Sequence, residues 1–166
     1  MSSLEGIRCR PIGTIHSPFV EPRGTPIQST AGKAFRASVE VFPEYSEGLL
    51  DLEGFSHLIL LYYFHRAAPY SLIAVPFMDS VPHGVFATRA PARPNPIGMS
   101  VVRLVERRNN ILEIQEVDIL DGTPLLDIKP FISDVDTRRH TRKGWLSRGI
   151  RRLRRTRDDA RFAGTP

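Results

Sequence analysis

The chain has 166 residues, which suits one domain and a short tail, and its apolar fraction of 41% suffices for a packed core. Its single cysteine excludes a disulfide within the chain and a zinc site built on several thiolates. The net charge is +5. The longest apolar run covers residues 58–64, whereas about 20 residues are needed to span a bilayer. We therefore expect a cytoplasmic protein without a membrane segment.

The first third of the chain contains two predicted strands separated by a loop. Residues 13–19 are a strand candidate, and residues 21–33 hold the prolines and glycines of a loop. Residues 36–41 alternate polar and apolar side chains, which is typical of a half-buried strand. Residues 43–52 begin with a proline and supply leucines, which favours a helical turn.

The middle of the chain is dominated by short strand candidates. Residues 57–64 are continuously apolar and predict a central strand covered on both faces. Residues 90–98 contain three prolines, which hold the backbone extended. Further short strands are predicted at 72–76, 84–88, 100–105, 111–117 and 125–132, with turn residues at 109–110 and 121–122. Many short strands predict an all-β fold: a single closed β-barrel with few short helices.

The charge is divided unevenly along the chain. Residues 1–137 carry 12 Lys and Arg against 16 Asp and Glu, a net −4, whereas residues 138–166 carry 11 against 2, a net +9. From Trp145 to Leu153, apolar residues recur every three or four positions among arginines, which favours a basic amphipathic helix or a disordered segment that becomes helical when bound. We therefore expect a β-barrel domain over 1–137 and a basic tail over 138–166 that contacts a phosphate backbone; a solvated charge run or a dimer contact is the alternative.

Several common catalytic motifs are absent from the sequence. No two glycines have the spacing of the dinucleotide-binding fingerprint, and there is neither a phosphate-binding P-loop nor the G-x-S-x-G elbow of hydrolases. The five histidines are scattered and form no H-x-H or H-E-x-x-H pair, so we expect no metal site.

Residues 84–100 form the most informative segment. Arg89 and Arg93 flank Pro91, and Asn95 lies between two further prolines. Prolines fix the backbone and remove its hydrogen-bond donor, so the segment suits a rigid rim that holds two guanidiniums for a carboxylate or phosphate. On residue physics alone, a surface crossover with solvated arginines is an equal alternative.

Residues 117–131 place polar side chains around a sharp turn. Asp121 and Gly122 begin the turn, and Asp127 and Lys129 follow on one face of a strand. Taken alone, these residues also fit a hairpin turn with a surface ion pair.

Residues 55–66 deliver His65 and Arg66 at the end of the apolar strand. Strand ends beside loops are common places for site residues, although a polar cap on the strand is the alternative. Residues 21–26, in isolation, are only a loop.

With these segments in this order, the sequence resembles the TrmO family, also called YaeB- or TsaA-like, of tRNA N6-threonylcarbamoyladenosine N6-methyltransferases. The resemblance covers residues 11–132 and is strongest in two pairs of runs, FATR with RPNPIGMS and DGTP with DIKP. Smaller matching motifs are Ile12–Ile15, Ser17–Phe19, Pro22–Gly24, Phe55–Leu58 and Phe64–Arg66. The chain is similar to the short form of the family, and its arginine-dense tail is not part of the motif set.

The resemblance implies a single β-barrel that acts as a homodimer on tRNA. It also implies S-adenosylmethionine as the methyl donor, bound without a Rossmann fold. By motif position, the implied cofactor contacts are Pro22, Arg23, Gly24, His65, Arg66, Arg89, Ser100, Val101, Leu120, Asp121, Gly122 and Thr123.

The chemistry of methyl transfer suggests roles for these groups. We expect Arg89 or Arg23 to bind the cofactor carboxylate, and the backbone around Gly122 to meet its adenine or ribose. The substrate N6 carries a carbonyl-containing group that makes its proton more acidic, so a strong general base is not required. Candidates for proton removal are Asp121, Asp127 and His65. Candidates for contacting tRNA around a splayed base are Arg93, Asn95, Arg138, Arg139, Arg151 and Arg152.

A non-catalytic RNA-binding β-barrel is the alternative function, and it predicts no response to S-adenosylmethionine in calorimetry. A metal-dependent hydrolase built on the scattered histidines is a third hypothesis, which metal analysis of the purified protein would decide.

Overall fold

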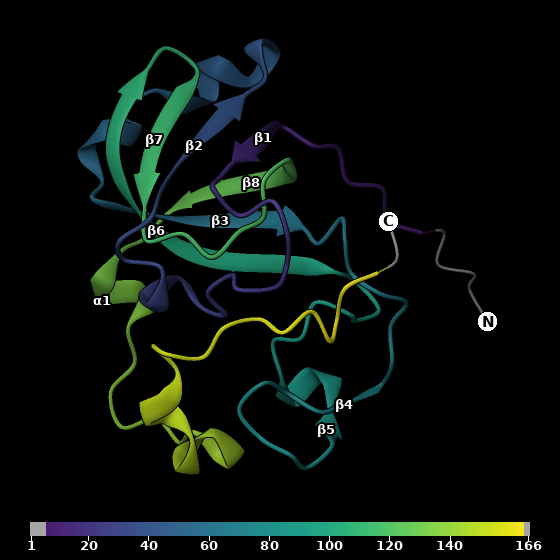
Figure 1. Ribbon diagram of the computed structural model, residues 1–166. Helices are drawn as coiled ribbons and strands as arrows, with labels where there is room; N and C mark the ends of the chain where they lie inside the picture. Colours follow the sequence, from purple (N-terminus) through teal and green to yellow (C-terminus); the bar gives the residue numbers. More distant parts are fainter. Residues whose placement is uncertain (1–5, 165–166) are drawn as a thin grey trace, which may run out of the picture.

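The computed structural model describes residues 6–164, and six strands of this range close into an antiparallel barrel (Figure 1). Around the barrel the strands follow the order β1, β2, β7, β6, β3, β8 and back to β1. Their bounds are Gly13–His16 for β1, Arg36–Val41 for β2, His57–Tyr63 for β3, Ile97–Arg108 for β6, Ile111–Gln115 for β7 and Thr123–Pro130 for β8. The predicted all-β closed barrel is confirmed.

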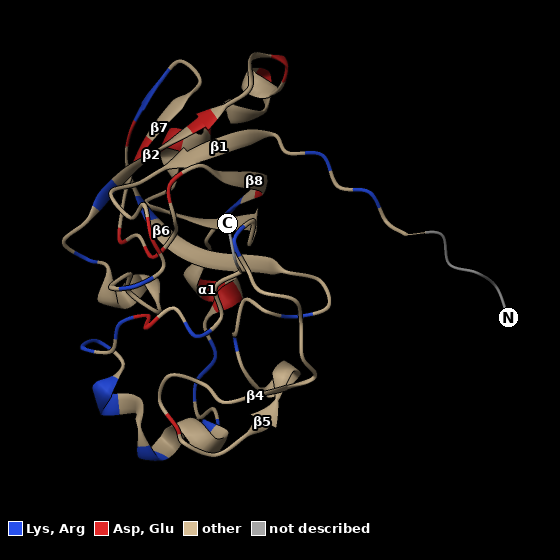
Figure 2. Ribbon diagram, turned by 45° about the vertical axis from the view of Figure 1, so that its right-hand side comes forward, with Lys and Arg blue, Asp and Glu red and all other residues tan. Residues whose placement is uncertain are grey.

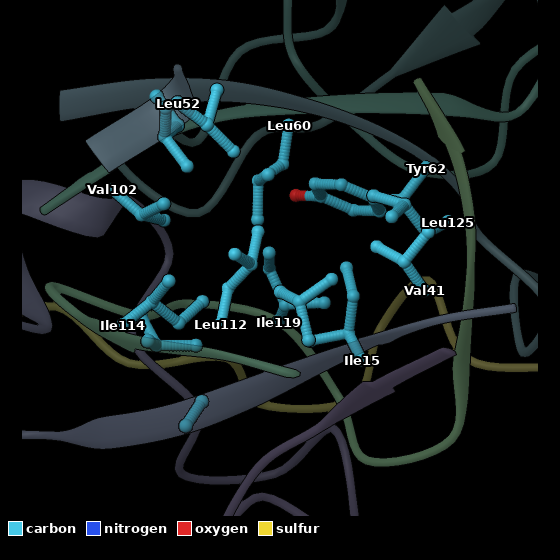
Figure 3. Close-up of a cluster of buried hydrophobic side chains, with 14 of the residues drawn as sticks. Ile15, Val41, Leu52, Leu60, Tyr62, Val102, Leu112, Ile114, Ile119 and Leu125 are labelled. Atoms are coloured by element: carbon cyan, nitrogen blue, oxygen red, sulfur yellow. The ribbon is translucent and has the colours of Figure 1, made fainter. Parts of the chain in front are cut away.

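The barrel interior is filled by the apolar side chains that alternate along each strand (Figure 3). The buried cluster consists of Ile15, Ala37, Val39, Val41, Leu49, Leu52, Leu58, Leu60, Tyr62, Val102, Leu112, Ile114, Val117, Ile119 and Leu125. On β3, Leu58, Leu60 and Tyr62 face inward, whereas Tyr63 on the other face is 44% exposed. The prediction that this strand is covered on both faces is therefore wrong, because the outer face of a barrel wall keeps solvent contact even where its residues are apolar.

Several predicted strands are shorter than expected, among them 13–19 and 84–88. β1 ends at His16, because the Ser17 hydroxyl donates to the Ile119 carbonyl and Pro18 has no N–H for the ladder. In the segment 84–88, only Gly84 is in a strand; β5 (His83–Gly84) pairs with β4 (Ile73–Ala74), and Val85–Ala87 forms a 3₁₀ helix.

The helices are few and short, as predicted. The one α-helix in the described range is α1 (Ser133–Asp136). The expected helical turn at 43–52 is a 3₁₀ helix over Pro43–Leu49. Other 3₁₀ helices are Ser29–Ala31, Leu52–Gly54, Gly144–Arg148 and Ile150–Arg152.

The tail forms two short 3₁₀ helices in place of one amphipathic helix and packs beside β4 and β5 below the barrel (Figure 1). Its Trp145 indole donates to the Ala87 carbonyl at 2.8 Å and stacks on His83 with 4.7 Å between ring centroids. Leu146, Ile150 and Leu153 face Met78 and Phe86 across an apolar chamber of about 460 Å³. The spacing of these apolar residues thus correctly indicated which side chains of the tail pack inward, although the backbone is not a continuous helix.

Charge is segregated over the molecule (Figure 2). Lys and Arg gather on the tail, and Asp and Glu lie mainly over the barrel and its loops. Among residues 6–164, no helix combines the length and the apolar composition needed to cross a membrane.

Candidate active site

A cavity of about 550 Å³ opens beside the end of β3 and the start of β6. Its wall consists of residues 25–28, Tyr62, Phe64, Phe77, much of the segment 86–99, residues 118–120 with Thr123, and Asp158 of the tail. Small-molecule sites usually enclose about 300–1,000 Å³. The barrel therefore brings distant parts of the sequence around one space of ligand size.

The proline-rich segment forms one side of this cavity. Arg89, Arg93 and Asn95 all line it. Arg89 Nη1 donates to the side-chain carbonyl of Gln28 at 2.8 Å, and Arg93 Nη1 donates to the Thr88 carbonyl at 3.3 Å. These bonds hold two guanidiniums at the cavity wall, where they suit a carboxylate or phosphate.

The turn at 120–123 reaches the same cavity, but through different side chains than expected. Leu120 and Thr123 line it, and Gly122 has a φ of +72°, the left-handed conformation that glycine adopts without strain. The Asp121 carboxylate instead accepts the Ser17 N–H at 3.0 Å and lies 3.8 Å from His16 Nδ1. Arg89 and the turn therefore share one cavity, whereas the Asp121 side chain faces another surface.

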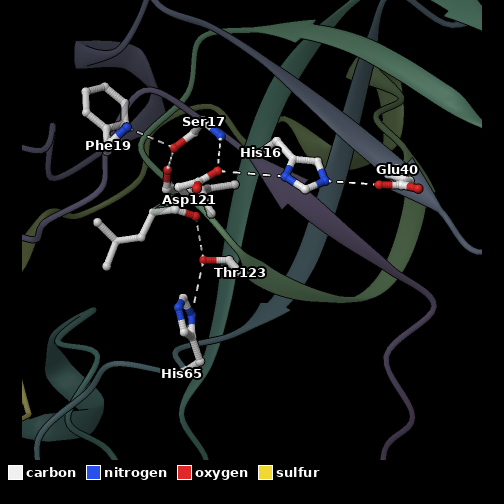
Figure 4. A network of polar contacts seen from close by, with 9 residues as sticks. His16, Ser17, Phe19, Glu40, His65, Asp121 and Thr123 are labelled. Atoms are coloured by element: carbon white, nitrogen blue, oxygen red, sulfur yellow. Dashed lines mark hydrogen bonds and ion pairs between the residues drawn. The ribbon is translucent and has the colours of Figure 1, made fainter. Parts of the chain in front are cut away.

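A chain of polar contacts fixes the turn against β1 and the end of β3 (Figure 4). The Thr123 hydroxyl donates to the Leu120 carbonyl at 2.7 Å, and the His65 Nδ1 lies 3.4 Å from that hydroxyl. Burial lowers the pKa of the His65 imidazole, and the charge of Arg66 lowers it further. The neutral form of His65 is thus favoured, and the residue contacts Thr123 of the cavity wall without lining the cavity itself.

Asp118 is a site residue that the sequence did not single out. Its side chain lines the cavity, and its Oδ1 accepts the Ser100 hydroxyl at 2.6 Å. The Ser100 oxygen also lies 2.9 Å from the buried Tyr62 hydroxyl. Burial raises the pKa of the Asp118 carboxyl to about 6, although the charge of Arg89 opposes the rise. A carboxyl that titrates near neutrality in a ligand-sized cavity is a strong functional candidate.

Asp118 was not predicted from the sequence because its neighbours on both sides are apolar. Asp118 lies between Val117 and Ile119, which are fully buried in the barrel core. A polar residue between two buried ones is ordinarily assigned to solvent. The cavity occupies that side of the chain instead.

Other predicted site residues lie outside the cavity. Asp127 forms an ion pair with Lys129 at 2.7 Å and borders a separate hollow beside Tyr45. Val101 is on the outer face of β6, opposite Ile59 of β3. The tail arginines proposed for tRNA are exposed at the surface: Arg138, Arg139, Arg151 and Arg152.

The loop of Pro22, Arg23 and Gly24 is held by the tail. The Gly24 N–H donates to the Asp158 carbonyl at 2.8 Å, and the Asp158 N–H donates to the Thr25 carbonyl at 2.9 Å. Pro22, Arg66 and Asp158 border a small side pocket that adjoins the main cavity. Residues beyond 137 therefore complete the wall of the site.

Within residues 6–164, no three side chains of His, Cys, Asp or Glu gather in a geometry that could hold a metal ion. The charged groups that line the cavity are instead two arginines and two carboxylates: Arg89, Arg93, Asp118 and Asp158.

Comparison with known families and structures gives consistent matches. Residues 14–137 match the family described as the tRNA-methyltransferase O N-terminal domain. A probable S-adenosyl-L-methionine-binding protein of Pyrococcus abyssi is 62% identical over 92% of this chain and 83% of its own length. A tRNA (adenine(37)-N6)-methyltransferase of Mus musculus is 36% identical over 76% of this chain and 31% of its own length.

Among solved structures, the crystal structure of TrmO from Pseudomonas aeruginosa superposes with a TM-score of 0.74 at 40% identity. That match covers 88% of this chain and 64% of the other. The chain thus spans under two thirds of that protein and about a third of the mammalian relative.

Proposed function

Because the chain belongs to the tRNA-methyltransferase O family, we propose that it is an S-adenosylmethionine-dependent tRNA methyltransferase acting on N6 of the threonylcarbamoyladenosine next to the anticodon. The observation that carries the proposal is the single cavity shared by the arginine-bearing proline segment, the turn at 120–123 and the Asp118 carboxyl.

The residues of the cavity fit the cofactor chemically. Guanidiniums suit its carboxylate, carboxylates suit its ammonium and sulfonium charges, and aromatic walls at Tyr62, Phe64, Phe77 and Phe86 suit the adenine ring. When bound, S-adenosylmethionine supplies an electrophilic methyl group. The protein's share of the work is to align the two reactants, which can supply about 7–11 kcal/mol of the barrier.

We assign removal of the substrate proton to Asp118 in place of Asp121 and Asp127. Its carboxyl borders the cavity, whereas theirs point to other surfaces. The Ser100 hydroxyl orients the Asp118 carboxylate, and Tyr62 in turn contacts Ser100. A base with a pKa near 6 is largely ionised at neutral pH and strong enough for the acidified N6 proton.

The tail supplies the cationic surface for tRNA. Its exposed arginines occur along the segment that follows α1 and on the layer beside β4 and β5, which adjoins the cavity (Figure 2). Contacts to phosphates from this surface would hold the anticodon loop while one base enters the cavity. We predict that the protein acts in the cytoplasm, where tRNA is abundant.

The outer face of the barrel supports a homodimer. Leu61 pairs with Met99 and Tyr63 with Ile97 on adjacent strands, and Tyr63, Ile97 and Met99 are 44–50% exposed. Ile97 and Met99 also line the cavity, so an interface on this face would lie at its rim. Such a contiguous apolar face on a barrel wall is typical of an interface. Tyr63→Glu should shift the protein from dimer to monomer in light scattering with unchanged circular dichroism; a wild-type protein that is monomeric would contradict the dimer.

The direct test combines purified protein, cofactor labelled in its methyl group and tRNA that carries threonylcarbamoyladenosine. We expect mass spectrometry of the nucleosides to show one added methyl on that base. The matched substrate is the same tRNA without the threonylcarbamoyl group, which should gain little label. A protein that binds tRNA but neither binds the cofactor nor transfers label would be the non-catalytic RNA-binding barrel.

A further inference from the structure

The end of the tail is inserted between two loops of the cavity wall. Arg157 pairs with Pro26, and Asp158 exchanges backbone hydrogen bonds with Gly24 and Thr25. Further along, the Ala68 N–H donates to the Phe162 carbonyl, and the Gly164 N–H donates to the Arg66 carbonyl, both at 2.9 Å. This segment is thereby fixed on both sides in the manner of a strand.

Asp158 is the charged side chain that this segment presents to the cavity. It lines both the main cavity and the side pocket, which share Phe64 and Pro91 as well. Its Oδ1 accepts the Ala160 N–H at 2.6 Å, and within the part of the chain that the structure describes, no hydrogen bond reaches Oδ2. Burial raises the pKa of this carboxyl, and the charges of Arg161 and Arg23 act in the opposite direction.

The neighbouring Asp159 behaves as an ordinary surface acid. It is exposed, forms an ion pair with Arg161 at 2.6 Å and takes no part in the cavity wall. The rest of the tail is rich in arginine. A half-buried acidic side chain at the cavity therefore indicates a specific role for a carboxylate at this position.

We propose that Asp158 binds the α-ammonium group of the methionine part of S-adenosylmethionine, at the corner where Arg66 brings a guanidinium for the α-carboxylate. The inference deepens the proposed function and rests on it. The amino-acid end of the cofactor is the one part that carries a positive and a negative group side by side. The corner at Asp158 offers the complementary pair, because Arg66 borders the same side pocket.

Asp158→Asn is the variant that separates binding from folding. The asparagine keeps an oxygen that can accept the Ala160 N–H, so the local turn is preserved while the charge is lost. Asp159→Asn is the matched control, since it removes a charge one residue away that does not face the cavity.

The experiment is calorimetric titration of the wild type and both variants with three ligands. S-adenosylmethionine and S-adenosylhomocysteine carry the α-ammonium, and 5′-methylthioadenosine lacks the whole amino-acid end. Asp158→Asn should weaken binding of the first two ligands about 10- to 100-fold, as expected for one charged hydrogen bond, and leave the third unchanged. Asp159→Asn should leave all three unchanged.

Three results would overturn the assignment. An equal loss for all three ligands would make Asp158 a structural residue, and no loss would remove it from the site. A loss confined to S-adenosylmethionine would place the carboxylate at the sulfonium. A wild type that binds none of the three would instead overturn the proposed function itself, and this assignment with it.

Discussion

Replacing Asp118 by asparagine should make the protein more stable at neutral pH while removing its activity. The substitution keeps an oxygen to accept the Ser100 hydroxyl but removes the carboxyl that titrates inside the cavity. Functional groups often lower the stability of the folded state, and the size of this effect at Asp118 is set by its raised pKa.

The magnitude follows from the raised pKa of Asp118, about 6 in the fold against 3.8 for an ordinary aspartate. This difference corresponds to up to about 3 kcal/mol, at 1.36 kcal/mol for each pH unit. The folded state binds the proton more tightly than the unfolded chain, so stability falls as pH rises. The stability that the protonated Asp118 carboxyl contributes is fully present below about pH 3.8 and is lost as pH rises through about 6. At pH 5, about half of it has been lost.

Urea unfolding of the wild type and Asp118→Asn at pH 4 and pH 7.5 measures this contribution. We expect the variant to gain up to about 3 kcal/mol over the wild type at pH 7.5 and much less at pH 4. Asp121→Asn, which removes a carboxyl from the same region but outside the cavity, should give no comparable gain. A gain equal at both pH values, or destabilisation at pH 7.5, would refute the reasoning about burial.

Three other variants test separate parts of the molecule. Arg89→Ala should weaken S-adenosylmethionine binding about tenfold or more in calorimetry, because it removes a cavity guanidinium; unchanged affinity would exclude that contact. Gly98→Ala should destabilise the fold by about 1–3 kcal/mol in thermal unfolding, since a Cβ there would lie 2.2 Å from the ring of Tyr62; wild-type stability would show that the ring moves freely. Exchanging Arg138 and Arg139 for glutamine should flatten the dependence of tRNA affinity on salt, and an unchanged slope would remove them from the interface.

The fold was largely predictable because its signals are local. The alternation over 36–41 predicted β2 with its bounds, and the turn residues near 109 and 121 correspond to left-handed backbone at Asn109 and Gly122. The end of β1 was predictable only in part, since Pro18 is visible in the sequence but the hydrogen bond from Ser17 goes to Ile119, a residue about a hundred positions away. Strand ends that are set by such distant contacts leave no local signal.

The site was predictable as a set of segments and less so as a set of side chains. The motif runs correctly brought Arg89 and Arg93 to one cavity with the turn at 120–123. The direction of each turn side chain depends on its backbone angles, which sequence does not give, so Asp121 was named in place of Asp118. Resemblance identifies a segment, whereas the three-dimensional fold decides which of its atoms face the ligand.

The basic tail shows why composition alone cannot assign a function to a segment. Its arginines suggest that it binds RNA. However, Trp145, Leu153 and Phe162 pack against the layer under the barrel, and Asp158 reaches the cavity. Deleting residues 145–166 would remove cationic surface and cavity wall together, so a loss of activity would not distinguish the two roles. Point substitutions can, because outward charges should change the salt dependence of tRNA binding, whereas the inward carboxylate should change cofactor affinity at every salt concentration.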